Sequence, residues 1–367
     1  MTASDFLHLT YLLAKRANFK NIRPNPFVGA IVVDKEGNVI GEGYHQKAGG
    51  PHAEVYAIED ALTKYNDLSE CTLYVSLEPC SHTGKTPPCT SLIMQHKIPK
   101  VAIGSMDPNP LVSGAKLLKD NGVMIEKCIL PEIVEMNTVY NINQIYKRPK
   151  YILKSAITLN GKIADRLGNS KWISNAKSRN FVHQVLRTNA DAILTTAKTV
   201  LKDNATMNIR VEGQEEQELN VVVFDKNLDL LKEENKHLAI FYERKNTKLY
   251  LVSDKSFEGQ IPNYIETIHI PIINDYFDLA LLNNALLSRN ICEVLVEGGA
   301  NLNTSMIKAG CIDELYMFVC PSLLFDNDAI NVFSSNEQHL MANSQKLELV
   351  ETKTFDSDIL VKYKILK

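Results

Sequence analysis

The residues of this chain with the clearest chemical potential are one histidine and two cysteines in separate segments. His52 lies in the stretch "PHAEV", and Cys80 and Cys89 lie in "EPCSHTGKTPPCT", each directly after a proline. Imidazole and thiolate are ligands that zinc prefers. With three protein ligands, a tetrahedral zinc ion keeps one position for water, whose pKa it lowers to about 7. The pattern predicts a catalytic zinc site held by these three residues.

Glu54 follows His52 by two residues, so we expect its carboxylate near the metal without being a ligand. From there it can take a proton from the water and pass it to a substrate. A structural zinc site is an alternative, because Cys71 or His82 could supply the fourth protein ligand that such sites use. A helix-terminal histidine and two loop cysteines with no shared function are a further alternative.

Local setting separates the two candidate cysteine ligands from other cysteines of the chain. Cys71 opens an apolar strand, and Cys311 and Cys320 flank another, as small core residues do. The two prolines before Cys89 fit the start of a helix. Cys89 would then lie in a first turn, where backbone amides and the helix dipole lower the pKa of a thiol. The sequence therefore predicts a thiolate at Cys89.

Composition describes an ordinary globular chain and excludes several functions. The chain has 367 residues, 45% of them hydrophobic, and a net charge of -3 from 40 basic and 43 acidic residues. This balance shows no basic face for a nucleic acid partner, and no apolar run reaches the roughly 18 residues of a membrane span. Seven cysteines, an odd number at low density, favour a reducing compartment. We therefore expect a cytoplasmic enzyme without a membrane or nucleic acid partner.

The order of predicted elements indicates two α/β domains. Residues 5–16 have helical spacing behind a possible Ser4 cap, and "FVGAIVVD" and "VIGEGY" are typical of a hairpin. Helices and strands then alternate up to "KRPK", where we place the boundary between a domain of residues 1–147 and one of residues 148–367. The second series runs through "YILKSAI", "DAILTT", "NVVVFD", "KLYLVSD" and "EVLVEGG". It ends in "KLELVETKTF" and "DILVKYKIL", spaced like a terminal hairpin.

The motifs "PNPFVGA", "HAE", "PCSHTGKTPPC" and "DPNPLVSG" give the first domain a family resemblance. His-x-Glu followed by Pro-Cys is similar to the zinc deaminase signature, and the longer cysteine loop resembles the deaminase half of the bifunctional deaminase-reductase family of riboflavin biosynthesis. The resemblance implies a cytidine-deaminase-like, three-layer α/β fold. It also implies hydrolysis of an exocyclic amine on a phosphoribosylated diaminopyrimidinone. The implied substrate-binding residues are Asn25, His45, His82, Lys85, Thr86, Asp107 and Asn109.

The second domain resembles the reductase half of the same family through "KSAITLNGKIAD", "GNSKWIS", "TVLKDN" and "LVEGGANL". The resemblance implies a dihydrofolate-reductase-like α/β fold, an NADPH cofactor, reduction of a ribosyl group to a ribityl chain, and a homo-oligomer. The implied substrate-binding residues are Lys154, Ser170, Arg187, Asp203, Arg210 and Glu297. The implied cofactor-binding residues are Trp172, Thr199, Gly298 and Gly299.

Four departures from the family pattern leave an alternative open. The segment after Gly114 is shorter than in the family, Asn160 stands where an aspartate is usual, Thr196 where a glycine is usual, and Ala205 where a proline is usual. A β-branched residue in a glycine-only conformation would strain the backbone at position 196. The alternative is an active deaminase with a degenerate, non-catalytic reductase-like domain. A deaminase acting on nucleic acid bases is a third hypothesis, which lacks the basic face it needs.

Overall fold

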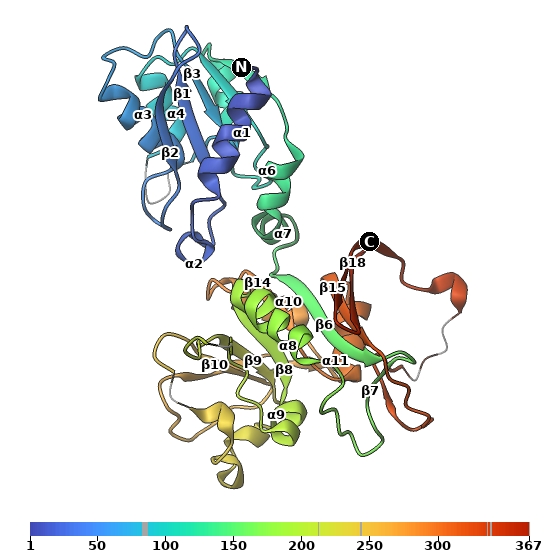
Figure 1. Ribbon diagram of the computed structural model, residues 1–367. Helices are drawn as coiled ribbons and strands as arrows, with labels where there is room; N and C mark the ends of the chain where they lie inside the picture. The colour runs from blue at the N-terminus through green and yellow to red at the C-terminus, as the bar shows by residue number, and fades with distance from the viewer. Residues whose placement is uncertain (83–86, 212, 243, 336, 338–339, 367) are drawn as a thin grey trace. The chain divides into compact units, whose positions relative to one another are not determined.

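The structure is a computed structural model of the chain that describes residues 1–82, 87–211, 213–242, 244–335, 337 and 340–366. The chain forms two compact units, Met1–Arg148 and Pro149–Lys367, each with its own sheet and its own hydrophobic core (Figure 1). Among the described residues, the structure holds no helix long and apolar enough to cross a membrane.

The first unit is a five-stranded sheet with helices on both faces. The strand order is β2-β1-β3-β4-β5, in which β1 is antiparallel to β2 and β3, while β3, β4 and β5 are parallel. The strands are β1 (Gly29–Val33), β2 (Val39–Tyr44), β3 (Thr72–Val75), β4 (Lys100–Ile103) and β5 (Met124–Lys127). The helices are α1 (Ala3–Ala14), α2 (Phe19–Ile22), α3 (Ala53–Leu62), α4 (Cys89–Gln95), α5 (Gly114–Asp120), α6 (Pro131–Met136) and α7 (Thr138–Tyr146).

Alternation of side chains along the strands builds two cores in this unit. One face of the sheet packs against α3, α4 and α5, with Ala57, Ile93 and Leu118 fully buried, and the other packs against α1 and α6 through Leu7 and Ile133. Figure 1 shows these two helical layers on either side of the sheet. Apolar residues at every position of β1 follow from this double cover, because a strand buried on both faces has no polar side. The predicted three-layer fold is confirmed.

The first helix begins earlier than the sequence indicates. It is capped by Thr2 rather than by Ser4, because Asp5 stands three residues after Thr2 and completes a capping box. The Asp5 carboxylate accepts from the backbone N–H of Thr2 at 2.7 Å, and the Thr2 hydroxyl oxygen accepts from the Asp5 N–H at 3.3 Å. Such a pair satisfies two N–H groups that a helix start leaves without partners.

The second unit is built on a nine-stranded sheet of order β11-β10-β9-β8-β14-β6-β15-β18-β17. The first seven of these run parallel, and β18 and β17 add an antiparallel edge. The strands are β6 (Lys150–Thr158), β7 (Lys162–Ala164), β8 (Ala192–Thr196), β9 (Asn220–Phe224), β10 (Leu249–Ser253), β11 (Ile265–His269), β12 (Ile272–Ile273), β13 (Tyr276–Phe277), β14 (Glu293–Val296), β15 (Ile312–Cys320), β16 (Ile330–Asn331), β17 (Leu347–Phe355) and β18 (Asp358–Ile365).

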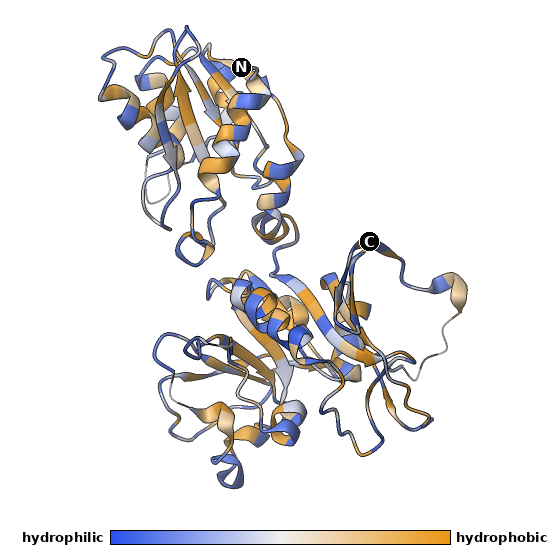
Figure 2. Cartoon of the chain, in the orientation of Figure 1, coloured by the Kyte–Doolittle hydropathy of each residue, from blue (hydrophilic) through white to orange (hydrophobic). Residues whose placement is uncertain are grey.

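Helices cover both faces of this sheet, whose central strands are strongly apolar (Figure 2). The helices α10 and α11 bury Leu286 and Met306 on one face, and η1 buries Leu186 on the other. The helices are α8 (Ala176–Phe181), the π-helical segment η1 (Val182–Arg187), α9 (Ala197–Asp203), α10 (Leu279–Leu287) and α11 (Ala300–Lys308), with 3₁₀ turns η2 (Asp229–Leu231), η3 (Glu233–Asn235), η4 (Ala239–Phe241) and η5 (Met341–Asn343).

Most strands of the second unit fall where the sequence predicts them, including the terminal hairpin of β17 and β18. The sequence does not predict the π-helical turn at η1, because its apolar spacing resembles that of an ordinary helix. Such turns are rare and often lie at functional sites. In this chain the turn carries His183 and Arg187, which both contact other candidate site residues.

Candidate functional site

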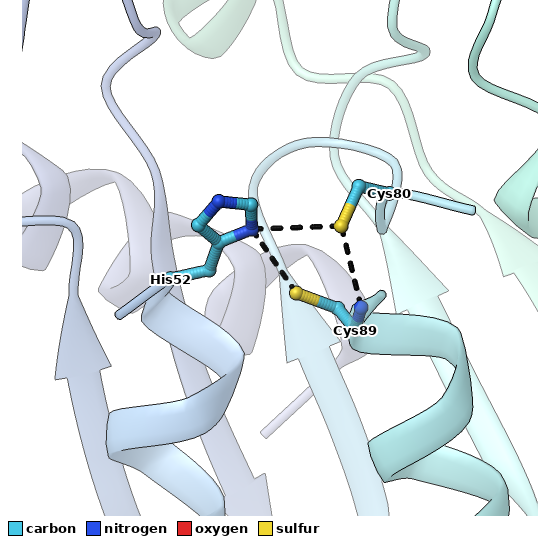
Figure 3. A group of neighbouring side chains, drawn as sticks. All are labelled: His52, Cys80 and Cys89. Atoms are coloured by element: carbon cyan, nitrogen blue, oxygen red, sulfur yellow. Dashed lines mark hydrogen bonds between the residues drawn. The ribbon is translucent and has the colours of Figure 1, made fainter. Parts of the chain in front are cut away.

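The predicted metal ligands converge in the first unit. The Nδ1 atom of His52 lies 3.2 Å from the Cys89 Sγ and 3.5 Å from the Cys80 Sγ, and the three ligand atoms all lie within 4.8 Å of one another (Figure 3). The Cys80 Sγ also accepts from the backbone N–H of Cys89 at 3.3 Å. No other group of three or more such ligands is found in the described part of the chain.

Each ligand is positioned by the end of a secondary-structure element. His52 is the N-cap residue of α3, and its side chain makes no capping bond, so the ring can face the cysteines. Cys89 is the first residue of α4, after Pro88 at the N-cap. Cys80 lies in the loop that follows β3, whose last residue is Val75. Figure 3 shows the histidine and Cys89 at the starts of their two helices.

The donor set and its geometry fit a zinc ion. Bonds of about 2.0 Å to nitrogen and about 2.3 Å to sulfur, in a tetrahedron, separate ligand atoms by about 3.5 Å. The two nitrogen-to-sulfur distances here are 3.2 and 3.5 Å. Of the two candidate fourth ligands, Cys71 is buried in the apolar core and His82 is exposed, and neither belongs to the group. The site thus offers three protein ligands among the described residues.

The two thiols interact through a hydrogen bond. A hydrogen bond from Cys89 lowers the pKa of Cys80 to about 4, and the same bond, together with burial, raises the pKa of Cys89. In this pair the lowered pKa belongs to Cys80 and not, as the sequence predicts, to Cys89. The helix start is present, but a neighbouring thiolate and burial outweigh it. A cation bound here would replace the remaining thiol proton, since cysteine binds metals as the thiolate.

Glu54 lies in the first turn of α3 and is buried, with 3% of its surface exposed. Burial raises the pKa of its carboxyl group, and the charge of His52 and a hydrogen bond with Cys89 oppose that rise. The carboxyl group thus lies beside the ligand set without belonging to it. A carboxyl group next to a metal site can take up a proton and release it to a substrate.

Asn25 and His45 form a pair beside this group. The His45 ring lies 5.6 Å from the His52 ring, and its Nε2 is 3.0 Å from the Asn25 Nδ2. The carbonyl oxygen of Pro51 accepts from the Nδ1–H of His45 at 3.0 Å. Nε2 is therefore the acceptor for Asn25, and the ring is neutral. Burial lowers the pKa of His45, which favours the neutral form of the ring.

Asp107 and Asn109 lie after the carboxyl end of β4, next to the loop after β3. Asp107 accepts from the backbone N–H of Asn109 at 2.8 Å. The buried carboxylate of Glu78 joins the two loops, accepting from the N–H of Ala115 at 2.9 Å and of Asp107 at 3.4 Å. Sequence reasoning missed Glu78, although it directly precedes the Pro-Cys pair. Two further predicted site residues, Lys85 and Thr86, lie outside the described residues.

Topology explains why these distant segments meet. Parallel strands β3 and β4 end at the same edge of the sheet, where loops commonly form ligand sites. The antiparallel strand β1 begins at that edge, just after Asn25, and β2 ends there, just before His45. The predicted residues of the first unit that the structure describes therefore share one edge.

In the second unit, Arg187 and Glu297 form a buried, bidentate ion pair. Arg187 Nε and Nη2 each donate to one Glu297 oxygen at 2.8 Å, with 10% and 14% of the two side chains exposed. Burial alone would raise the pKa of Glu297, but Arg187 outweighs it and lowers the pKa to about 2. The charge of Lys154 also lowers the pKa of Glu297. Burial lowers the pKa of Lys154 itself. These three predicted residues form one charged cluster.

His183 belongs to the same cluster and was missed by sequence reasoning. Its Nδ1 accepts from the backbone N–H of Arg210 at 2.9 Å. Burial and the charges of Arg187, Arg210 and Lys154 lower the pKa of His183 to about 4. The ring is therefore neutral at pH 7, with its remaining proton on Nε2. No motif in the sequence singles out His183, because its contact with Arg210 depends on the fold.

The remaining predicted residues of the second unit are spread along its sheet edge and loops. Gly299 caps α11 directly after β14, and a Cβ atom there would meet nothing within 4 Å, which leaves open space at the helix start. Trp172 is 72% exposed with the Arg179 guanidinium over its ring. Ser170 is partly buried in a loop, Asp203 ends α9, Thr199 lies in its first turn, and Gly298 precedes Gly299.

The structure gives local reasons for two departures from the family pattern. Thr196 has φ of -124° and is the N-cap of α9, accepting from the Thr199 N–H at 3.3 Å, so the expected strain is absent. Asn160 donates to the Leu324 carbonyl at 2.9 Å and accepts from the Leu324 N–H at 3.2 Å. An aspartate could not donate in this pair. Ala205 packs against the core around α9.

In a comparison with known proteins, each unit of the chain matches a family model. Residues 1–105 match the family described as "Cytidine and deoxycytidylate deaminase zinc-binding region", and residues 149–361 match the "RibD C-terminal domain". The chain is similar to the riboflavin biosynthesis protein RibD of Aquifex aeolicus, with 34% identity over 94% of both chains, and to that of Escherichia coli, with 31% identity over 95% of both.

A solved structure of a related enzyme is similar to this chain over nearly its whole length. The diaminohydroxyphosphoribosylaminopyrimidine deaminase / 5-amino-6-(5-phosphoribosylamino)uracil reductase of Thermotoga maritima matches with a TM-score of 0.80 and 34% identity, covering 99% of both chains. Fold and site together define a two-domain enzyme, a zinc-binding deaminase joined to a reductase. The chain belongs to the RibD family of bifunctional riboflavin biosynthesis enzymes. This membership favours the bifunctional hypothesis over a degenerate second domain.

Proposed function

We propose that the first unit hydrolyses the exocyclic amine of 2,5-diamino-6-(5-phosphoribosylamino)pyrimidin-4-one, and that the second unit then reduces the ribosyl group of the product to a ribityl chain with NADPH. The observation that carries this proposal is the convergence of His52, Cys80 and Cys89 with the buried Glu54 beside them. The end-to-end similarity to an enzyme named for both activities supports the same reactions here.

In the first unit, Glu54 is the catalytic acid–base group. A zinc ion held by His52, Cys80 and Cys89 would supply a Lewis acid and would lower the pKa of water to about 7. Glu54 takes a proton from the attacking water and delivers it to the departing amine, so that a carbon–oxygen bond forms, the carbon–nitrogen bond breaks and ammonia leaves. Its buried position beside the three ligands suits both steps, because the group must reach the water and the departing amine.

The polar residues at the same sheet edge bind the substrate. The Asn25 amide and the neutral His45 face the base. Asp107 and Asn109, with His82, line the ribose-phosphate side, and Asp107 can accept from ribose hydroxyl groups. We assign Lys85 and Thr86 to the phosphate, since a lysine suits a phosphate monoester.

In the second unit, the charged cluster binds the phosphorylated substrate next to the cofactor. Lys154 and Arg210 face the anionic substrate, with Ser170 and Asp203, and Arg187 holds Glu297 in place through their ion pair. The open space at Gly299 and the start of α11 suits a pyrophosphate, because helix N-termini bind anions. Bound NADPH would supply hydride to the anomeric carbon of the sugar. We assign Trp172, Thr199 and Gly298 to the cofactor as well.

We also propose a cytoplasmic homo-oligomer that pairs through β17. This strand is one edge of the nine-stranded sheet, and its residues 347–354 are exposed. Leu349 and Val350 are 58% and 42% exposed. A long edge strand with exposed apolar side chains can pair with a second copy. Sedimentation of the wild type against Leu349→Lys tests this, and a monomeric wild type would contradict it.

One assay tests both activities separately. Purified protein is incubated with the diaminopyrimidinone ribotide, with and without NADPH, while ammonia release and nicotinamide absorbance are followed. We expect ammonia in both reactions and loss of NADPH absorbance only after ammonia appears. Ammonia release without NADPH consumption would contradict the reductase assignment, and no ammonia from zinc-loaded protein would contradict the deaminase assignment.

A further inference from the structure

Two side chains of the last helical segment of the first unit reach into the proposed substrate edge. Asn137, at the junction of α6 and α7, is 2% exposed, and Tyr140 lies one turn further along α7. A spacing of three residues places both on one face of the helix. Each of them contacts a different loop of the site, although neither carries a motif that the sequence analysis singled out.

Asn137 fixes the loop that carries Asn25. The Asn137 Oδ1 accepts from the backbone N–H of Phe27 at 2.8 Å, and the Asn137 Nδ2 donates to the Phe27 carbonyl at 3.0 Å. This pair satisfies both backbone groups of Phe27, two residues after Asn25 and two before β1. The Asn137 amide thus bonds to the Phe27 backbone as a neighbouring strand would. These bonds fix the position of Asn25, which lies in the same loop.

Tyr140 holds the carboxylate of Asp107 end-on. Its hydroxyl oxygen lies 3.0 Å from the Asp107 Oδ1 and 3.1 Å from the Oδ2. A donor that both oxygens share fixes the position of the carboxylate group, and a second donor on one oxygen is needed to fix its rotation. The backbone N–H of Asn109 adds a second bond, to Oδ1. With these two donors in place, the remaining lone pairs of Asp107 have one fixed direction.

The electrostatics of the pair agree with this geometry. Burial raises the pKa of Asp107, while the N–H of Asn109 and the hydroxyl of Tyr140 oppose that rise by bonding to the charged form. Burial and the adjacent charge of Asp107 raise the pKa of Tyr140, so the hydroxyl keeps its proton and remains a donor. Tyr140 therefore helps to keep a partly buried carboxylate charged.

We propose that Tyr140 is a positioning residue of the deaminase reaction, which orients the Asp107 carboxylate toward the ribose hydroxyl groups of the substrate. The inference rests on the proposed function, because it takes Asp107 to be a substrate-binding residue. Tyr140 acts through Asp107 and does not touch the reacting atoms. Asn137 positions the loop that carries Asn25 in the same way. Two neighbouring residues of one helical segment thus position two of the proposed substrate-binding loops.

The test is a double-mutant cycle on the full-length, zinc-loaded enzyme. Tyr140→Phe removes one hydroxyl and keeps the ring, so we expect the KM for deamination to rise about tenfold, as loss of a hydrogen bond to a charged group does, with kcat within twofold of wild type. Asp107→Asn should raise the KM at least as much. In the Asp107→Asn background, Tyr140→Phe should add less than twofold, because groups that act through each other are not additive.

Matched controls separate positioning from folding. Tyr65→Phe removes a hydroxyl from an exposed tyrosine outside the site and should change no kinetic constant. Zinc content and NADPH-dependent reduction by the second unit should be unchanged in every variant.

Each remaining outcome overturns a defined part of the proposal. An unchanged KM in Tyr140→Phe, with a raised KM in Asp107→Asn, would overturn the inference and leave the proposed function standing. An unchanged KM in Asp107→Asn would overturn both the inference and the substrate-binding assignment of Asp107. Equal, additive effects of the two substitutions would overturn the claim that Tyr140 acts through Asp107.

Discussion

The two candidate sites solve the problem of buried charge in different ways. In the first unit, His52, Cys80 and Cys89 lie close enough together to bind a cation, whose charge would offset that of the deprotonated thiols. In the second unit, Arg187 and Glu297 neutralise each other without any ion. The site of the first unit therefore depends on a metal ion for its charge balance. The site of the second unit depends on packing that excludes water from the Arg187–Glu297 ion pair.

This difference determines how each site responds to a substitution. Removing a proton carrier beside a metal site should stop chemistry and leave the fold intact, because the ligands remain. Removing one partner of a buried ion pair leaves an uncompensated charge and should damage both the fold and the chemistry.

The largest effect on activity is expected from Glu54→Gln. Glutamine keeps the shape of the side chain but cannot carry a proton, so ammonia release should fall by about 10²–10⁴-fold, the range of general acid–base catalysis. Zinc content and NADPH oxidation with the deaminated intermediate should remain at wild-type levels. Normal deamination by this variant would show that another group moves the proton.

Glu297→Gln should cost both stability and activity in the second unit. It leaves the Arg187 guanidinium buried without its counter-charge, which costs about 3–5 kcal/mol in comparable pairs. We expect a lower melting temperature by calorimetry and loss of NADPH oxidation, with ammonia release unchanged. Asp356→Asn, which breaks the solvent-exposed pair with Lys177, is the matched control and should change neither property. Equal effects of the two substitutions would contradict the role of burial.

His183 gives the second unit a dependence on pH. The pKa of His183 is lowered to about 4 in the folded protein, against an ordinary value of 6.5. Between these values the unfolded chain binds a proton that the folded chain excludes, so stability is lost as the pH falls from about 6.5 toward 4. The charged groups around the ring are Arg187, Glu297, Arg210 and Lys154.

Melting temperatures between pH 7 and pH 5 test this dependence. They should fall more steeply for the wild type than for His183→Asn, because the asparagine oxygen can accept from the Arg210 N–H without titrating. Parallel slopes for the two proteins would refute the assignment.

The smallest effect is expected from Thr196→Gly, which restores the residue usual in the family. Thr196 has an extended conformation and caps α9, and glycine at an N-cap costs only a few tenths of a kcal/mol relative to threonine. The melting temperature and the KM for NADPH should therefore change little. A marked gain in reductase activity would mean that the threonine side chain obstructs the cofactor.

Sequence reasoning succeeded best where residue type alone carries the chemistry. The group of His52, Cys80 and Cys89 was predictable because few side chains bind zinc, and each stood beside a recognisable helix or loop signal. The sheet strands were predictable from apolar runs. The pKa of Cys89 was not, because it depends on a thiolate neighbour as well as on the helix start.

The contributions of Glu78, Tyr140 and His183 were also beyond the sequence. Each acts through a hydrogen bond to a residue 27 or more positions away, which only the fold brings near. The π-helical turn that carries His183 has no signature in the apolar pattern. Side chains that bind other protein groups are thus harder to predict than side chains that bind a metal.

The most direct measurement is the metal content of the protein together with its two activities before and after chelation. We predict one zinc ion per chain, loss of ammonia release when the ion is removed, full recovery on adding one equivalent of zinc, and undisturbed NADPH oxidation throughout with the deaminated intermediate. Metal-free protein that releases ammonia at the original rate would contradict this account.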